Sequence, residues 1–108
     1  MHIEPPFRER AMRFVLDEFG ITLDDLLSSS RRKELAEARS LFVWIIRSYR
    51  PSVSYQTIGS WIGIRHHTSV IEAHARAVRL RLSNADFDDA CERFAALYRS
   101  TGDIHACH

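Results

Sequence analysis

Four consecutive side chains in the middle of the chain can exchange hydrogen bonds: His66, His67, Thr68 and Ser69. Histidine and serine can donate or accept, and the threonine methyl group can contact another methyl, such as that of thymine. If these residues open a helix, the free amides of its first turn also favour a phosphate. Two histidines alone are more often a solvated turn before a helix, so their meaning depends on the elements around them.

The basic run Arg31-Arg32-Lys33 is the second candidate for binding chemistry. Taken alone, such a run is usually a solvated loop. The overall charge of +1 does not indicate a polyanion-binding protein, but the charges are unevenly distributed. The range 39–81 holds seven arginines against a single acid, Glu72, and the ranges on either side of it are acidic. This polarity is expected when one face of a protein meets a polyanion.

Groups that could support catalysis or bind a metal are few. No spacing pairs a nucleophile with a base, and we expect no enzyme, no cofactor and no small-molecule substrate. The carboxylate pairs at 24–25 and 88–89 are typical of a first helical turn, where the helix dipole favours negative charge. His105, Cys107 and His108 carry zinc-binding groups, but a structural zinc site needs a fourth ligand and an ordered backbone. We therefore interpret them as a frayed terminus.

Length and composition limit the architecture. With 108 residues, 45% of them hydrophobic, we expect one domain over residues 1–108. No window approaches the roughly 20 apolar residues of a membrane span, and the first residues do not resemble a secretory signal. The two cysteines do not form a disulfide framework. We expect a cytoplasmic protein with no membrane partner.

Apolar residues recur with helical spacing along most of the chain, which predicts an all-α fold, a compact bundle of about six helices. A first helix over residues 6–19 places on one stripe Phe7, Ala11, Phe14, Val15, Glu18 and Phe19. Thr22 can cap a very short second helix whose inward residues are Leu23, Leu26 and Leu27. A central helix from about 34 to 49 is apolar on more than one side, as a buried helix requires.

The next segment has the pattern of a helix-turn-helix. Ser54 can cap a short helix, and Gly63 supplies a turn before a longer one. We expect the inner face of the longer helix to hold Val70, Ile71, His74 and Val78. Asn84 or Asp86 can cap a last helix. Its predicted inward residues are Phe87, Cys91, Phe94, Leu97 and Tyr98.

Several strings between about residues 12 and 82 resemble the C-terminal DNA-binding domain of the bacterial replication initiator DnaA. The most specific is Ile58-Gly59 followed by Gly63-Ile64-Arg65-His66-His67-Thr68-Ser69-Val70. It is similar to the family signature of Ile-Gly, a short spacer, and Gly-Arg-Asp-His-Thr-Thr-Val. The strings Phe19-Gly20-Ile21 and Asp25-Leu26-Leu27-Ser28, with the arginines after them, resemble the family's Tyr-Gly-Ile, Asp-Leu-Leu-Ser and basic loop.

The resemblance implies binding to double-stranded DNA through a Trp-repressor-like helix-turn-helix. The family's base-reading positions correspond to His66, His67, Thr68 and Ser69. The arginine that enters the minor groove corresponds to Arg31, with Arg32 and Lys33 beside it. Phosphate contacts are implied for Arg39 and Arg47, and we add Arg65.

The sequence also departs from the family pattern. His66 stands where the family has an acid, and Glu37-Ala38-Arg39-Ser40 replaces Arg-Pro-Arg-Gln, which we expect to alter two polar contacts. There is no Gly-Lys-Ser/Thr string, so we expect no initiator ATPase in this chain.

Two functions follow as hypotheses. The first is sequence-specific DNA binding at sites like the DnaA box, by a nucleoid-associated regulator of replication or transcription. The alternative is a protein-interaction module with weak or lost DNA binding that contacts the initiator or another protein. The departures at Glu37 and Ser40 favour the second hypothesis, whereas the retained His67, Thr68 and Arg31 favour the first.

Overall fold

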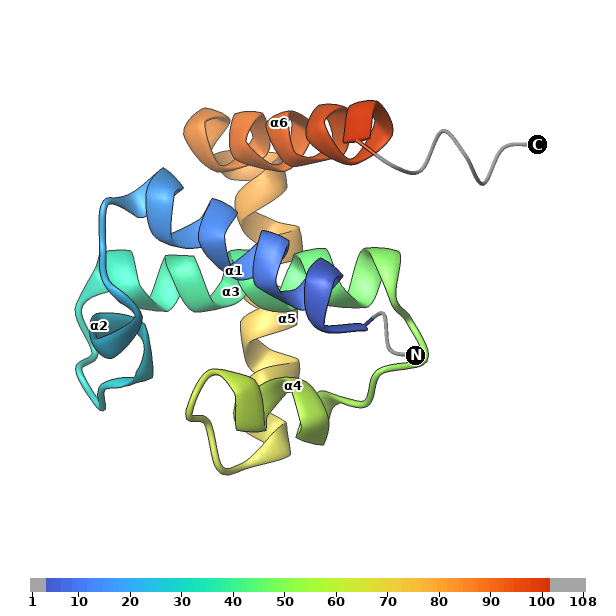
Figure 1. Ribbon diagram of the computed structural model, residues 1–108. Helices are drawn as coiled ribbons and strands as arrows, with labels where there is room; N and C mark the ends of the chain where they lie inside the picture. The colour runs from blue at the N-terminus through green and yellow to red at the C-terminus, as the bar shows by residue number, and fades with distance from the viewer. Residues whose placement is uncertain (1–3, 102–108) are drawn as a thin grey trace.

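The computed structural model describes residues 4–101, with side chains from Phe7 to Ser100. This part of the chain is all-α, as the sequence predicts, and contains six helices and no strand (Figure 1). The helices are α1 (Glu4–Phe19), α2 (Leu23–Leu27), α3 (Lys33–Tyr49), α4 (Tyr55–Trp61), α5 (His67–Ser83) and α6 (Ala85–Thr101). No helix among the described residues is long and apolar enough to cross a membrane.

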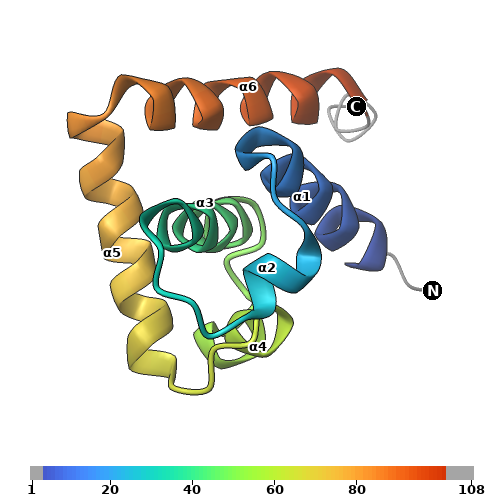
Figure 2. The same ribbon diagram turned by 90° about the vertical axis from the view of Figure 1, so that its left-hand side faces the viewer.

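Helix α3 is the centre of the fold. It packs against α1, α2, α5 and α6, and Figure 2 shows it nearly end-on among them. Its buried residues lie on more than one side, as predicted: Leu35, Ala38, Ser40, Leu41, Phe42, Val43, Ile45 and Ile46. Neighbouring helices cover α3 on several sides. The hydrophobic free energy gained by burying these residues holds α1 and α5 in place against it.

Local capping signals set the helix boundaries that the sequence predicts. Thr22 accepts from the amide of Asp25 and the Asp25 carboxylate accepts in return from the amide of Thr22, which is a capping box. Ser54 caps α4 by accepting from the amide of Thr57. Asn84 caps α6 by accepting from the amide of Phe87.

The inward face of α5 differs from the predicted one. Val70 is buried and His74 half-buried, but Ile71 and Val78 are exposed by 41% and 48%. The buried residues are instead Val70, Ala73 and Ala77. Helix α5 thus meets α3 through small side chains, which allow a close approach and turn the larger aliphatic residues outward.

Three leucines predicted to face inward are exposed. Helix α2 has only five residues and buries Leu26 alone, leaving Leu23 and Leu27 at the surface. Helix α6 meets the core through Phe87, Ala90, Cys91 and Phe94, and Leu97 lies beside this face. A short or peripheral helix has fewer neighbours, so it buries fewer of its apolar residues than their spacing predicts.

An aromatic cluster connects α6 to α1 and α3. The rings of Phe7, Tyr49, Phe94 and Tyr98 lie edge-to-face, tilted or stacked, with centroids between 4.5 and 6.4 Å apart. The guanidinium carbon of Arg50 lies 4.1 Å from the centroid of Phe7. An ion pair between Arg93 and Glu18 adds a link between α6 and α1.

Candidate nucleic-acid interface

Helices α4 and α5 form the helix-turn-helix, and two glycines allow their tight junction. Gly63 has a φ of +76°, a conformation that other residues adopt only with strain. A Cβ atom on Gly59 would lie 2.7 Å from the carbonyl oxygen of Ile64 and 2.9 Å from a methyl group of Val70. The amide of Ile64 also donates to the carbonyl of Gly59 at 2.9 Å. The turn therefore lies directly on the end of α4 and fixes where α5 begins.

The beginning of α5 presents the four predicted base-reading residues to solvent. His66 is the N-cap, and His67, Thr68 and Ser69 form the first turn. All four are exposed, and so is Arg65 just before them. The His66 side chain makes no capping hydrogen bond, so the imidazole is not needed to hold the helix end. We call these four residues the tip of α5.

The basic loop, residues 28–33, is held by the side chain of Arg39. The Nε atom of Arg39 donates to the carbonyl of Leu26 at 2.9 Å. Its two terminal nitrogens donate to the carbonyls of Ser30 and Ser28 at 2.9 and 2.7 Å. One guanidinium thus fixes the three carbonyls that lead into Arg31. Burial lowers the pKa of Arg39, but arginine is so basic that the side chain stays charged near neutral pH.

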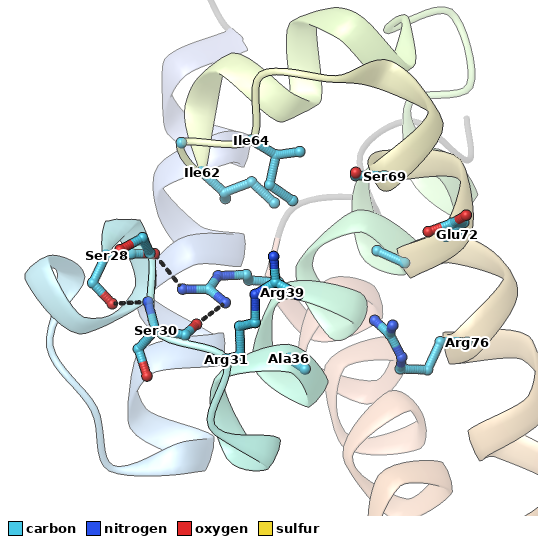
Figure 3. Close-up of a pocket in the computed structure, with 13 residues that line it drawn as sticks. Ser28, Ser30, Arg31, Ala36, Arg39, Ile62, Ile64, Ser69, Glu72 and Arg76 are labelled. Atoms are coloured by element: carbon cyan, nitrogen blue, oxygen red, sulfur yellow. Dashed lines mark hydrogen bonds between the residues drawn. The ribbon is translucent and has the colours of Figure 1, made fainter.

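Ser69, the last residue of the tip of α5, and residues 28–31 of the basic loop line the two sides of one cleft of about 480 Å³ (Figure 3). Arg31 and Arg39 lie on the loop side, whereas Ser69, Glu72 and Arg76 come from α5. Arg31, like Arg32 and Lys33, is exposed. The structure therefore brings together the two clusters that the sequence separates by about one third of its length.

Arg47 lies at the junction of α3, α4 and α5. One of its terminal nitrogens donates to the carbonyls of Pro51 and Val53, both at 2.9 Å. Its guanidinium carbon lies 4.4 Å from the centroid of the Tyr55 ring. The Nε atom of Arg47 is buried without a hydrogen-bond partner. Like Arg39, this arginine has internal contacts that the sequence did not indicate.

Tyr55 continues this network to α5. Its hydroxyl lies 3.0 Å from Nδ1 of His74. Burial, and then the positive charge of Arg47, lower the pKa of His74 below its usual 6.5. The imidazole is therefore neutral at pH 7, and its Nδ1 can accept the hydrogen bond from Tyr55. His74, which the sequence places on the inner face of α5, is thus half-buried and hydrogen-bonded.

Two charged residues of the cleft, Glu72 and Arg76, were not predicted from the sequence as site residues. They lie three and seven residues after Ser69, the spacing of one helix face, so periodicity counted from the tip could have found them. Arg76 donates to the hydroxyl of Ser40 at 3.3 Å, and Ser40 is fully buried. Glu37 lines a different cleft, beside α6. The departures at Glu37 and Ser40 therefore lie outside the exposed surface that the tip and the loop share.

No group of three or more histidine, cysteine or carboxylate side chains that could hold a metal ion occurs within the described range 4–101. His105, Cys107 and His108 lie outside that range. Burial raises the pKa of the Cys91 thiol to about 12, so it is an unreactive core residue. Asp25 takes part in the α2 cap, and Asp88 pairs with Arg81 at 2.7 Å. These carboxylates have structural contacts.

A helix-turn-helix with an exposed polar tip beside a basic loop defines a class of DNA-binding domain. Comparison with known families agrees with the geometry. The model of the bacterial dnaA protein helix-turn-helix family matches residues 9–77, and the chain belongs to this family. The matched range runs from α1 into α5 and leaves out α6.

Curated relatives are chromosomal replication initiator proteins DnaA. The protein from a Synechococcus species is 29% identical over 85 residues, which are 79% of this chain and 18% of the relative. That from Pelobacter propionicus is 36% identical over 76 residues, 70% of this chain and 16% of the relative. The chain thus spans less than a fifth of the relatives it matches. No solved structure gave a significant match.

Proposed function

We propose that this chain binds double-stranded DNA sequence-specifically, at sites like the DnaA box, as a regulator of replication or transcription at the bacterial nucleoid in the cytoplasm. The observation that carries the proposal is that Ser69, at the exposed tip of α5, and the exposed Arg31 line one cleft. Either cluster alone could equally be a solvated surface with no DNA-binding role. In this proposal they contact two neighbouring grooves of one duplex, with the intervening strand between them.

In this proposal the tip of α5 enters the major groove. His66, His67 and Ser69 offer donors and acceptors to base edges, and the Thr68 methyl group suits a thymine methyl. The open amides of the first turn and its positive dipole end favour a nearby phosphate. His66 replaces an acid of the family, and an imidazole can donate where a carboxylate only accepts. We therefore propose that His66 prefers guanine, whose major-groove edge carries two acceptors.

Arg31 would enter the adjacent minor groove, with Arg32 and Lys33 on its flanking phosphates. A narrow A·T-rich minor groove concentrates negative potential, which attracts an arginine. Arg39 holds the carbonyls of Ser28 and Ser30, so the backbone that leads into Arg31 is positioned before DNA binds. Preorganisation of this kind raises affinity because less conformational entropy is lost on association.

Phosphate contacts are proposed for Arg65, which is exposed beside the tip, and for Arg39 and Arg47. A guanidinium has five N–H donors, and Arg39 uses three of them internally. Any phosphate contact of Arg39 must therefore use the remaining two. Arg47 is similar, because one of its terminal nitrogens donates to two backbone carbonyls.

The alternative function, a protein-interaction module that contacts the initiator, loses the support of the altered residues. Glu37 lines a different cleft, and Ser40 is fully buried and accepts a hydrogen bond from Arg76, so their change does not imply lost direct DNA contacts. The role that we propose requires no catalytic step, cofactor or small-molecule substrate.

A salt series tests the proposal. Fluorescence anisotropy would compare a DnaA-box duplex with a scrambled duplex of equal composition. If the interface neutralises a handful of phosphates, log affinity falls linearly with log salt, with a slope of roughly −3 to −5 at about −0.9 per contact. We expect tighter binding to the box at every salt concentration. Affinity that does not change with salt, or equal affinity for both duplexes, would overturn sequence-specific DNA binding.

A further inference from the structure

Glu72 is the single acid in the arginine-rich range 39–81, and it lies on the exposed surface of α5. It follows Thr68 by four residues and Ser69 by three, so it lies one turn further along the same side of the helix. It also lines the cleft opposite the basic loop, as Figure 3 shows. A negative charge is thus placed where the proposed function puts DNA.

None of the arginines of the cleft forms an ion pair with Glu72 among the described residues. Arg39 donates to three backbone carbonyls, and the hydrogen bond of Arg76 goes to Ser40. Among the described residues 4–101, four ion pairs occur and none includes Glu72. A carboxylate without a partner faces repulsion from the phosphates of a bound duplex, and a hydrogen bond accepted from the DNA itself can offset that cost.

We infer that Glu72 determines sequence specificity by accepting a hydrogen bond from the exocyclic amino group of a cytosine. This inference rests on the proposed DNA binding. In the major groove only cytosine and adenine present an amino donor. Adenine carries the N7 acceptor beside its amino group, which repels a second carboxylate oxygen, whereas cytosine N4 has no acceptor beside it on the same base. Because Glu72 lies one turn along α5 from Thr68 and Ser69, the base pair that it contacts is next to those that Thr68 and Ser69 contact.

Binding-site selection from randomised duplexes would test this assignment. We expect the wild-type chain to select cytosine at one position next to the bases read by the tip. Glu72→Gln should change that position alone to adenine, because a glutamine amide pairs with adenine N6 and N7. Glu72→Ala should lose preference there, with at least about fivefold less discrimination against the other bases.

Asp89→Asn is the matched control, because it removes a charge from an exposed acid on α6, away from the cleft. It should leave the selected motif unchanged. Glutamine and alanine are good helix formers, so thermal melts should show that both Glu72 variants fold as wild type does.

Two results would overturn the inference, and they differ from failure of the proposed function. If wild type selects a motif and both Glu72 variants select the same motif, Glu72 does not read DNA. If both variants instead bind every duplex more tightly by one common factor, Glu72 is only a repulsive charge. Should the wild-type chain itself show no salt-dependent DNA binding, the proposed function fails and this inference fails with it.

Discussion

The tip of α5, through Ser69, and the basic loop border one cleft, but the two regions are held in different ways. The tip is positioned by backbone, through the close approach of Gly59 to Ile64 and Val70. The loop is positioned by one side chain, the guanidinium of Arg39. The side chains of the tip can therefore change with little effect on the fold, whereas the loop depends on a residue outside itself.

The same difference separates two kinds of arginine. Arg31 and Arg65 are exposed, and both are available to a polyanion. Arg39 and Arg47 bind backbone carbonyls within the protein. A basic sequence segment is thus not equivalent to a basic surface, because part of its positive charge holds the surface together.

The largest effect should come from the double variant His67→Ala, Thr68→Ala. Both side chains are exposed at the start of a helix, so we expect unchanged thermal stability. Each lost base contact should cost about 1–3 kcal/mol of discrimination between box and scrambled duplexes, measured by anisotropy. Arg65→Ala is the contrasting variant and should weaken both duplexes alike. If the two variants affect the duplexes in the same way, the tip does not read bases.

Arg39→Gln should have the next largest effect, and on the other region. It leaves the carbonyls of the loop without their charged donor, which should lower the free energy of unfolding by about 1–3 kcal/mol in urea titrations. The preference for A·T pairs in the flanking minor groove should also decrease.

Arg39→Lys separates positioning from phosphate contact. An ammonium keeps the charge but cannot reach three carbonyls with the geometry of a guanidinium. We expect this variant to retain the salt dependence of wild type and to lose the A·T preference. If it keeps the A·T preference, and Arg39→Gln makes the salt slope shallower by about one contact, Arg39 serves DNA binding through its phosphate contact alone and not by positioning the loop.

The smallest effect concerns the contact between α4 and α5. The lowered pKa of His74 means that protonation favours the unfolded chain, since the unfolded value is near 6.5. The stability contribution is complete above pH 6.5 and is lost as the pH falls through the lower, folded value. Protonation also removes the acceptor for Tyr55.

Urea titrations between pH 7.5 and 5.5 would measure this effect. Wild type should lose stability toward acid, and His74→Gln should lose less. Tyr55→Phe serves as the control, because it removes the hydroxyl and leaves the histidine to titrate. Equal pH dependence in wild type and His74→Gln would show that His74 does not couple folding to protonation.

Local signals in the sequence predict the helices well. Thr22, Ser54 and Asn84 cap the helices expected of them, because a cap needs only the next three residues of the chain. The prediction that Ile71 and Val78 face inward on α5 was wrong, because which residues of α5 are buried depends on how closely α3 approaches. No local pattern carries this information.

The site shows the same limit. Sequence strings indicated the tip and Arg31, and both are exposed beside one cleft. The internal contacts of Arg39 were not predictable, because its carbonyl partners lie 9 to 13 residues earlier in the chain and are brought near only by the packing of α2 on α3. Glu72 was noted only as a charge, since its place in the cleft follows from the fold.

The central claim is that the tip of α5 and Arg31 read two neighbouring grooves of one duplex. A cycle of four anisotropy measurements tests it, with wild type and Arg31→Ala each bound to a DnaA-box duplex and to the same duplex with its flanking A·T pairs replaced by G·C. We expect the replacement to weaken wild type and to leave Arg31→Ala nearly indifferent, because the mutant has no side chain for the narrow groove. If the mutant is as sensitive to the flanking pairs as wild type, Arg31 does not enter the minor groove and the two-groove account is contradicted.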